Sequence, residues 1–550
     1  MAANAGDDRA GAVLANWASG DVRGAEEVRS VRLRKSVGAA ADATVYPVVR
    51  EDLSVLRERL SRLSGVERIW SRSDGIQLRL SDAEIAGLGA ELVAGGLPPL
   101  CLGRDQPRKY VISFCDPNAT KALHVGHMRS LALGGGLGCL LEEAGANVVR
   151  QSIVCDWGMA MAEACAGYLS CCRDETPSSQ GLRPDEFVGR CYSRYAAKSD
   201  TRPHEPDHDS RPARDRAGDL AFRYLERMRG ADPSAERLRQ RLRDWVIEGH
   251  LHTFERIGVA FDRLLYESDA LALIEPLVER ALAQGIFQTG QEEGSVILAT
   301  SSGGPGVPMI RAGGFETTYL RQFAIWHELE RTRQPDVGCI NIMGNEWTEK
   351  TIARERALPA LIETAYGEHY RRIDLGMVKA GGQAIKSRDG GAFLIENCLD
   401  WLAADLPLPL RGGSGPGARR EASAFTLKAF FLARRSSAPI AFSPKKLLDP
   451  KSSPGLTIGA ALFGRAEAGG RDDPSELRYA VCRALELRPI CGTAIAKCEL
   501  VPVVRYLMHL AAWLGAAERG SLTRRVARYA IASGARAVGL APWSEAQADS

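Results

Sequence analysis

Residues 110–154 read YVISFCDPNATKALHVGHMRSLALGGGLGCLLEEAGANVVRQSIV, and this stretch decides the fold. It opens with the apolar run YVISF, typical of a buried strand, and closes with a second such run at 147–154. Residues 125–144, which lie between the two runs, have the apolar spacing of a helix. A strand, a helix and a strand in succession predict a βαβ unit, and therefore a parallel sheet.

The composition of the whole chain limits the class of protein. Of its 550 residues, 45% are hydrophobic and 25% charged, which excludes a disordered, collagen-like or coiled-coil chain. The net charge of +3 excludes a histone-like polycation but allows a locally basic groove. No apolar run reaches the length of a membrane span, and the first residues do not have the pattern of a secretion signal. The 13 cysteines contain no Cys-x-x-Cys pair, so we expect no metal site and a reduced, cytoplasmic setting.

Three regions differ in their sequence patterns. Residues 1–103 predict a small α+β module, and residues 104–405 predict an α/β region with a helical insertion at about 160–260. Glycine and proline accumulate at 406–420, which we interpret as a linker. Residues 421–550 have helical periodicity and no obvious strand, so we expect a helical bundle there.

The sequence His124-Val-Gly-His127 lies where the first strand passes into the helix. Ligands bind at the carboxyl ends of strands in open parallel sheets, and helix N-termini attract phosphate. The two histidines share the first helical turn and can donate hydrogen bonds to phosphate oxygens. Gly126 leaves room for a nucleotide against the backbone, and Lys121 adds a mobile positive charge. The alternative is a pair of surface histidines beside a glycine turn.

A second cationic loop, GGQAIKSRDGG, occupies residues 381–391. Lys386 and Arg388 could neutralise a pyrophosphate leaving group there, and Ser387 could donate a hydrogen bond to it. Exposed Lys-Ser-Arg loops are common, so this loop alone is weak evidence for a phosphate site. It indicates one only together with the HVGH sequence that precedes it.

Together these two elements resemble the two signature motifs of class I aminoacyl-tRNA synthetases. Further motifs resemble the arginyl-tRNA synthetase family: PNATK at 117–121, MRS at 128–130, DWG at 156–158 and RIGVAFD at 256–262. Residues 74–81 resemble the end of that family's N-terminal tRNA-binding module, and residues 421–545 resemble its helical anticodon-binding domain. The resemblance covers nearly the whole chain.

The resemblance implies a class I, Rossmann-type catalytic domain between a small α+β domain and an α-helical domain. It implies that the carboxylate of an amino acid attacks the α-phosphate of ATP, which gives an aminoacyl-adenylate and pyrophosphate. The acyl group then passes to an acceptor, normally the 3′ end of tRNA. Mg²⁺ would enter with ATP as a substrate ion, without a protein-built metal site, and the enzyme would be a monomer.

The resemblance also assigns roles to individual residues. The catalytic group would be His124, His127, Lys121, Lys386 and Arg388. ATP would be bound by His124, Gly126, His127, Gly344, Lys386 and Ser387. The amino acid would be bound by Ser113, Asn118, Asp156, Tyr319 and Gln322, with Asn118 and Asp156 holding its carboxylate and amino group.

Two of these positions depart from the family pattern. Ser113 stands where the family has a glutamate, and Gln322 stands where it has an aspartate. Because burying a guanidinium without a carboxylate costs several kcal/mol, we expect a neutral amino acid, an apolar one included, instead of arginine. The alternative is a misaligned register, or compensation by Glu316 or Glu346, which are near in sequence.

Three hypotheses about function follow. The first is a divergent paralogue that activates a neutral amino acid and passes it to tRNA or to a small-molecule amine, in antibiotic biosynthesis, another specialised pathway or self-resistance. The second is an arginyl-tRNA synthetase that charges tRNA(Arg) for translation. The third is a catalytically inactive RNA-binding or regulatory paralogue, which the intact Lys121, His124, His127 and Lys386 oppose.

Overall fold

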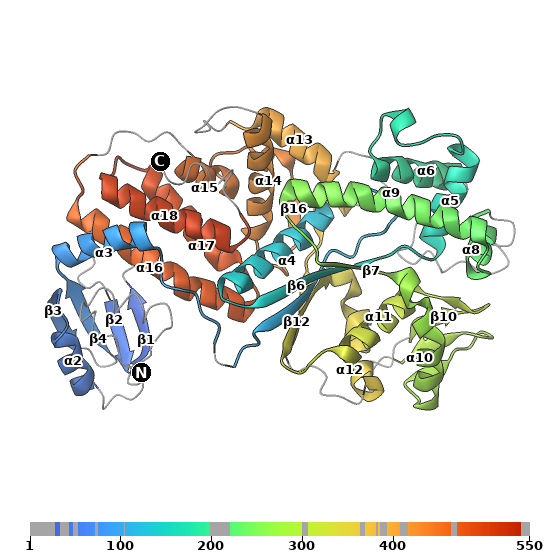
Figure 1. Ribbon diagram of the computed structural model, residues 1–550, viewed down its shortest axis with the longest axis horizontal. Helices are drawn as coiled ribbons and strands as arrows, with labels where there is room; N and C mark the ends of the chain where they lie inside the picture. Colours follow the sequence, from blue (N-terminus) through green and yellow to red (C-terminus); the bar gives the residue numbers. More distant parts are fainter. Residues whose placement is uncertain are drawn as a thin grey trace.

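The structure is a computed structural model. It describes residues 28–33, 43–47, 53–71, 75–103, 105–198, 220–299, 306–362, 369–380, 383–384, 393–407, 416–463 and 470–540. A parallel sheet lies at the centre, with an α-helical insertion on one side and the N- and C-terminal regions on the other (Figure 1). In this part of the chain no helix is long and apolar enough to cross a membrane.

The central sheet has five strands in the order β13-β12-β5-β6-β7, and every neighbouring pair is parallel. Its strands are β5 (Lys109–Ser113), β6 (Asn147–Val154), β7 (Arg263–Tyr266), β12 (Val337–Gly344) and β13 (Tyr370–Leu375). The predicted βαβ unit is β5, α4 (Val125–Glu143) and β6, with β5 placed one residue earlier than the sequence pattern indicates. The prediction of an α/β, parallel-sheet fold is confirmed.

Helices cover both faces of this sheet. Helix α4 packs on the face that carries Ile112 and Ile340, and its glycines allow a close approach, since an ideal Cβ on Gly134 would lie 2.3 Å from the Phe114 ring. The opposite face carries Ile153 and Cys339, which pack against α11 (Thr318–Thr332) and α12 (Thr348–Ile362).

The helical insertion has an apolar core of its own, and an antiparallel sheet follows it. Its helices are α5 (Met159–Cys171), η2 (Ser178–Gln180), α6 (Pro184–Lys198), α8 (Leu220–Arg229) and α9 (Pro233–Ile257). After β7 come η3 (Glu267–Ala270) and α10 (Leu271–Ala283), then β8 (Phe287–Thr289), β9 (Val296–Leu298), β10 (Val307–Arg311) and β11 (Phe315–Glu316). The sequence pattern does not reveal the strand β7, because four residues are too few to show a period of two.

The N-terminal region pairs four antiparallel strands in the order β1-β2-β4-β3. Its elements are β1 (Val28–Leu33), β2 (Ala43–Pro47), α2 (Leu53–Ser61), β3 (Val66–Ser71), β4 (Ile76–Leu80) and α3 (Asp82–Gly95). Ser81 caps α3, since its side chain accepts a hydrogen bond from the Glu84 N–H. Arg478 donates to the Leu80 carbonyl at 2.8 Å and ties this module to the C-terminal helices.

Two details of the C-terminal region correct the sequence prediction. Helix α14 begins at Pro416, inside the predicted linker 406–420, because proline suits the first turn of a helix. A short strand, β16 (Ile440–Phe442), lies in the region predicted to lack strands and pairs with β14 (Val378–Ala380). The other elements are η4 (Asn345–Trp347), β15 (Gln383–Ala384), α13 (Ile395–Asp405), α14 (Pro416–Leu432), η5 (Pro444–Leu447), α15 (Pro454–Phe463), α16 (Pro474–Lys497), α17 (Val501–Gly515) and α18 (Ser521–Ala537).

Candidate active site

The HVGH sequence forms the N-terminal cap of α4. His124 Nδ1 accepts a hydrogen bond from the Gly126 N–H at 3.1 Å, and His127 Nδ1 accepts one from the His124 N–H at 3.2 Å. The ring centroids are 4.0 Å apart. Because both Nδ1 atoms accept, each neutral ring carries its proton on Nε2 and has that N–H left to donate to a ligand.

Both histidines are neutral near pH 7. Burial lowers the pKa of His124 to about 4, and the charge of Lys121 acts in the same direction. Burial also lowers the pKa of His127 well below its usual value. Phosphate oxygens at this cap would therefore meet neutral N–H donors at the positive end of a helix.

Gly126 has a structural role beside the predicted one. An ideal Cβ at this position would lie 2.7 Å from the His124 ring, so the ring can fold back onto the cap only over glycine. The prediction that Gly126 leaves room for a nucleotide remains a prediction.

The start of α4 meets the chain just after the second predicted motif. The Val125 N–H donates to the Phe393 carbonyl at 2.9 Å, and the Ile395 N–H donates to the Leu123 carbonyl at 3.1 Å. Residues 385–392, which include Lys386, Ser387 and Arg388, lie outside the described residues, so their roles remain predictions.

The turn after β5 contains a strained residue. Cys115 has a φ of +58°, which is uncommon without glycine, and its N–H donates to Ser130 Oγ at 3.0 Å. Asp116 follows, and its Oδ1 accepts a hydrogen bond from the Ile153 N–H at 2.9 Å. This turn joins β5 to β6 at their carboxyl ends and presents the exposed Asn118, which forms a parallel bridge with Cys155.

Ser113 ends β5 in a row of polar side chains on the face covered by α11 and α12. Asn341, Ser113 and Gln151 stand opposite one another on β12, β5 and β6. Ser113 is 0% exposed and Gln151 1%, and neither side chain has a hydrogen-bond partner. The position that carries glutamate in the family pattern is therefore a neutral, unsatisfied hydroxyl beside an unsatisfied amide.

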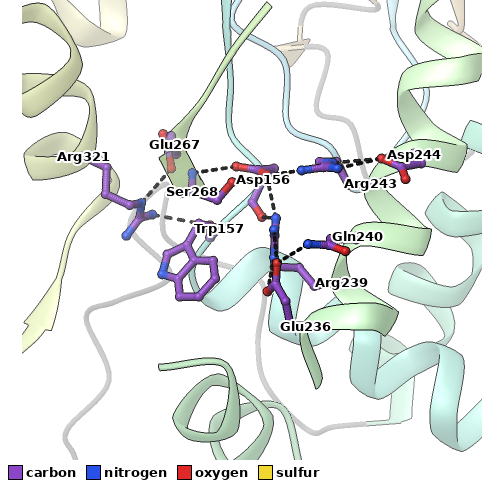
Figure 2. A network of polar contacts seen from close by, with 10 residues as sticks. All are labelled: Asp156, Trp157, Glu236, Arg239, Gln240, Arg243, Asp244, Glu267, Ser268 and Arg321. Atoms are coloured by element: carbon purple, nitrogen blue, oxygen red, sulfur yellow. Dashed lines mark hydrogen bonds and ion pairs between the residues drawn. The ribbon is translucent and has the colours of Figure 1, made fainter. Parts of the chain in front are cut away.

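Asp156 is fully buried at the end of β6, and both of its oxygens have partners (Figure 2). Arg239 of α9 donates to Oδ2 at 2.6 Å, and the Ser268 N–H donates to Oδ1 at 2.9 Å. The Arg239 guanidinium also lies over the Trp157 ring, 5.4 Å from its centroid. Asp156, the carboxylate predicted to hold the amino group of the substrate, is therefore bound by Arg239 of the helical insertion.

A second buried carboxylate, Glu267, lies beside Gln322. Arg321, which is 2% exposed, donates to Glu267 Oε2 at 2.8 Å (Figure 2). Gln322 Nε2 donates to Glu267 Oε1 at 3.4 Å. Burial raises the pKa of Glu267, while the Arg321 charge acts against that rise. The acid nearest Gln322 is therefore already paired with an arginine of the same chain.

Of the remaining predicted residues, Glu316 belongs to this cluster, since Arg321 donates to its carbonyl oxygen at 2.9 Å. Tyr319 is buried in the apolar core, and its hydroxyl donates to the Lys350 carbonyl. Gly344 ends β12, and an ideal Cβ there would lie 2.3 Å from Glu346 Oε1. The suggested stand-in Glu316 accepts a hydrogen bond from Trp157 Nε1 at 2.9 Å.

Sequence reasoning missed several residues of this site. They are Gln151, Arg239, His250, Glu267 and Arg321. Glu267 and Ser268 directly follow a strand, and recognising β7 would have placed them at the carboxyl edge of the sheet. Among the described residues, no group of three or more His, Cys, Asp or Glu side chains could hold a metal ion.

Comparisons with known proteins point to one family. The family described as "tRNA synthetases class I (R), catalytic domain" matches residues 101–318. The chain is 28% identical over 297 residues to an arginine–tRNA ligase of Treponema pallidum, covering 54% of this chain and 48% of that protein. It is 25% identical over 383 residues to one of Bacteroides fragilis, covering 65% and 63%. The chain thus spans about half the length of the first of these relatives.

Solved structures match over a longer range. The arginyl-tRNA synthetase of Thermus thermophilus superposes with a TM-score of 0.64 at 18% identity, covering 98% of this chain and 99% of that one. The Plasmodium falciparum enzyme gives a TM-score of 0.62 at 11% identity, covering 96% of each chain. At these identities the match shows a shared fold.

Proposed function

Because the chain is a member of the arginyl-tRNA synthetase family, we propose that it is an ATP-dependent ligase that activates a neutral amino acid and transfers it to an acceptor. In the first step an amino-acid carboxylate oxygen bonds to the α-phosphorus of ATP, and the bond to pyrophosphate breaks. In the second step a hydroxyl or amine attacks the acyl carbon, and AMP leaves. Mg²⁺ enters as a companion of ATP.

The cap of α4 supports the activation step. The His124 and His127 rings keep their Nε2–H groups for phosphate oxygens, and the positive end of α4 lies behind them. Lys121 supplies charge as pyrophosphate develops, with Lys386 and Arg388 as the proposed partners from the second motif. Catalysis of this kind depends on positioning and charge neutralisation, without a covalent enzyme intermediate.

The observation that carries the choice of a neutral substrate is the pairing of Glu267 with Arg321. Ser113 and Gln322 offer no carboxylate to a substrate guanidinium, and the neighbouring acid Glu267 already receives the Arg321 guanidinium at 2.8 Å. A substrate guanidinium would have to displace Arg321 or remain buried without a counterion, which costs several kcal/mol. A neutral side chain meets no such cost.

The acceptor is a nucleophile of one of two kinds. The tRNA 3′ hydroxyl is supported by the flanking N-terminal and helical regions, which superpose together with the catalytic domain on the Thermus thermophilus enzyme. A small-molecule amine, in a specialised biosynthetic or self-resistance pathway, is consistent with the altered amino-acid pocket. We also propose a monomer, which light scattering of the purified chain tests.

One contact favours a second candidate, an arginyl-tRNA synthetase for translation. Gln322 Nε2 lies 3.4 Å from Glu267 Oε1, so one carboxylate does stand beside the position where the family pattern has an aspartate. If Arg321 moved away, Glu267 would be available to arginine. This candidate requires exchange activity with arginine alone.

Amino-acid-dependent exchange of pyrophosphate into ATP tests the proposal, with all twenty amino acids, with and without tRNA. Exchange with a neutral amino acid supports it, and exchange with arginine alone supports the second candidate. Absence of exchange under every condition favours the inactive paralogue. Hydroxylamine, which traps the adenylate as a hydroxamate, reports activation even when the natural acceptor is missing. Incubation with tRNA or with an amine then separates the two acceptors.

A paired substitution sharpens the test. Ser113→Glu with Gln322→Asp restores the two acids of the family pattern, and we expect arginine-dependent exchange to appear or rise in this variant. The control is the single variant Ser113→Gln, in which Gln322 is unchanged. It adds similar volume at position 113 without charge. If the acidic pair and the control responded equally to arginine, charge would not be the selecting property.

A further inference from the structure

The loop before the HVGH sequence is held by the helical insertion. On α6, Gly189 comes so close that an ideal Cβ would lie 3.4 Å from Lys121 Cβ, and the Tyr192 ring centroid is 5.7 Å from Lys121 Nζ. On α9, His250 reaches the backbone of the same lysine. Two helices far along the chain thus contact the residue that carries the predicted catalytic charge.

His250 makes its contact from a fully enclosed position. It is 1% exposed, and its Nε2 lies 2.9 Å from the Lys121 carbonyl oxygen. A carbonyl oxygen only accepts hydrogen bonds, so Nε2 carries the proton and donates it. Nδ1 is then an unprotonated acceptor, and it is buried without a hydrogen-bond partner. The tautomer and the direction of the ring are therefore set by the Lys121 carbonyl.

The helix that carries His250 is itself braced. Gly249 packs so closely on α6 that an ideal Cβ would lie 2.3 Å from Asp185 Cγ. Asp185 is 0% exposed, accepts a hydrogen bond from the Glu186 N–H at 2.9 Å and pairs with Arg183 at 3.2 Å. Because α9 is fixed against α6 next to His250, the imidazole has little freedom to follow a moving loop.

We propose that His250 is a positioning residue for the nucleotide-binding loop, acting through its Nε2–H bond to the Lys121 carbonyl. The bond sets residues 121–124, and so sets where the Lys121 ammonium and the His124 ring stand when a triphosphate binds. His250 touches no substrate in this role. This proposal rests on the proposed function in one respect, which is that ATP is the ligand of residues 121–124.

Two polar substitutions separate positioning from simple packing. His250→Gln can place an amide N–H near the position of Nε2, whereas His250→Asn is too short to reach the carbonyl. We expect the asparagine variant to raise the KM for ATP in the exchange assay by about tenfold, the size of a lost hydrogen bond, with a smaller effect on the KM for the amino acid. The glutamine variant should stay close to the wild type. His252→Asn, at an exposed position on the same helix, is the matched control.

Hydrogen–deuterium exchange of the ligand-free protein provides a readout that needs no activity. The amides of His124, Gly126 and His127 are bonded within the cap. They should exchange faster in His250→Asn than in His250→Gln or His252→Asn. If the asparagine and glutamine variants matched each other in loop exchange and in ATP KM, the proposal would be overturned. If the wild type neither bound ATP nor exchanged pyrophosphate, the proposed function would fail, while the loop amides would still decide the role of His250.

Discussion

Replacing Asp116 by asparagine should stabilise the protein at alkaline pH and have little effect in acid. Asp116 lies in the turn between β5 and α4, where its Oδ1 accepts a hydrogen bond from the Ile153 N–H at 2.9 Å. Burial raises the pKa of its carboxyl from 3.8 to about 6; the Ile153 N–H and the Arg354 charge oppose this rise, and Glu267 adds to it. Asparagine keeps the accepting oxygen and removes the charge.

The direction of the effect follows from the raised pKa. Since the folded protein holds this proton more tightly than the unfolded chain, the contribution of Asp116 to stability is fully present below pH 4. It is lost as the pH rises through 6. A shift of about two pKa units corresponds to about 3 kcal/mol. We therefore expect the asparagine variant to gain about 3 kcal/mol over the wild type at pH 8, and less than about 1 kcal/mol at pH 4.

Urea denaturation at pH 4, 5, 6, 7 and 8, followed by circular dichroism, measures this difference. The hydrogen exchange of the Ile153 amide reports the same site locally and does not require the whole chain to unfold in one step. Asp374→Asn, which removes a partly exposed carboxylate paired with Arg372, is the matched control. A stability difference that stayed constant from pH 4 to pH 8 would refute the reasoning, since it would show that the Asp116 carboxyl does not titrate in this range.

Three further predictions concern the buried charges and the cap. Glu267→Gln leaves the Arg321 guanidinium buried without its carboxylate. It should lower the free energy of unfolding by about 3–5 kcal/mol, measured by thermal or urea denaturation. A double variant with Arg321→Met should recover part of that loss. Arg239→Met should destabilise the protein far more than Arg243→Met, because the first side chain is 3% exposed and the second 19%; equal losses by the same assay would contradict this. His127→Leu removes a neutral phosphate donor and should lower the rate of pyrophosphate exchange about 100-fold or more, with unchanged circular dichroism as the check on folding.

Local pattern was sufficient for the core of the fold and for part of the site. The strand, helix and strand at 110–154 are recognisable because each element has a period long enough to show in the sequence. The HVGH cap is equally local, since its hydrogen bonds join residues no more than three apart. The helix α3 and its Ser81 cap follow from the same short-range chemistry.

The rest of the site depends on pairs that are distant in the chain. Arg321 and Glu267 are 54 residues apart, Arg239 and Asp156 are 83 apart, and His250 and Lys121 are 129 apart. No periodicity in the sequence links such pairs. The sequence therefore shows that positions 113 and 322 lack the acids of the family pattern. It does not show that Glu267 and Asp156 are already paired with arginines. The sequence analysis did not identify strand β7. This strand pairs with β6 and brings Glu267 to the edge of the sheet where β6 ends.

Under the proposed function, the charge of the substrate side chain is the property by which this site selects its amino acid. Glu267 is paired with Arg321 and Asp156 with Arg239, so these two buried acids are matched within the chain. Carboxylates at positions 113 and 322 would add two negative charges beside Glu267, and only a bound cation would offset their repulsion and desolvation. With Ser113 and Gln322 in place, an incoming guanidinium would be a surplus positive charge among completed ion pairs. A neutral side chain leaves both ion pairs intact.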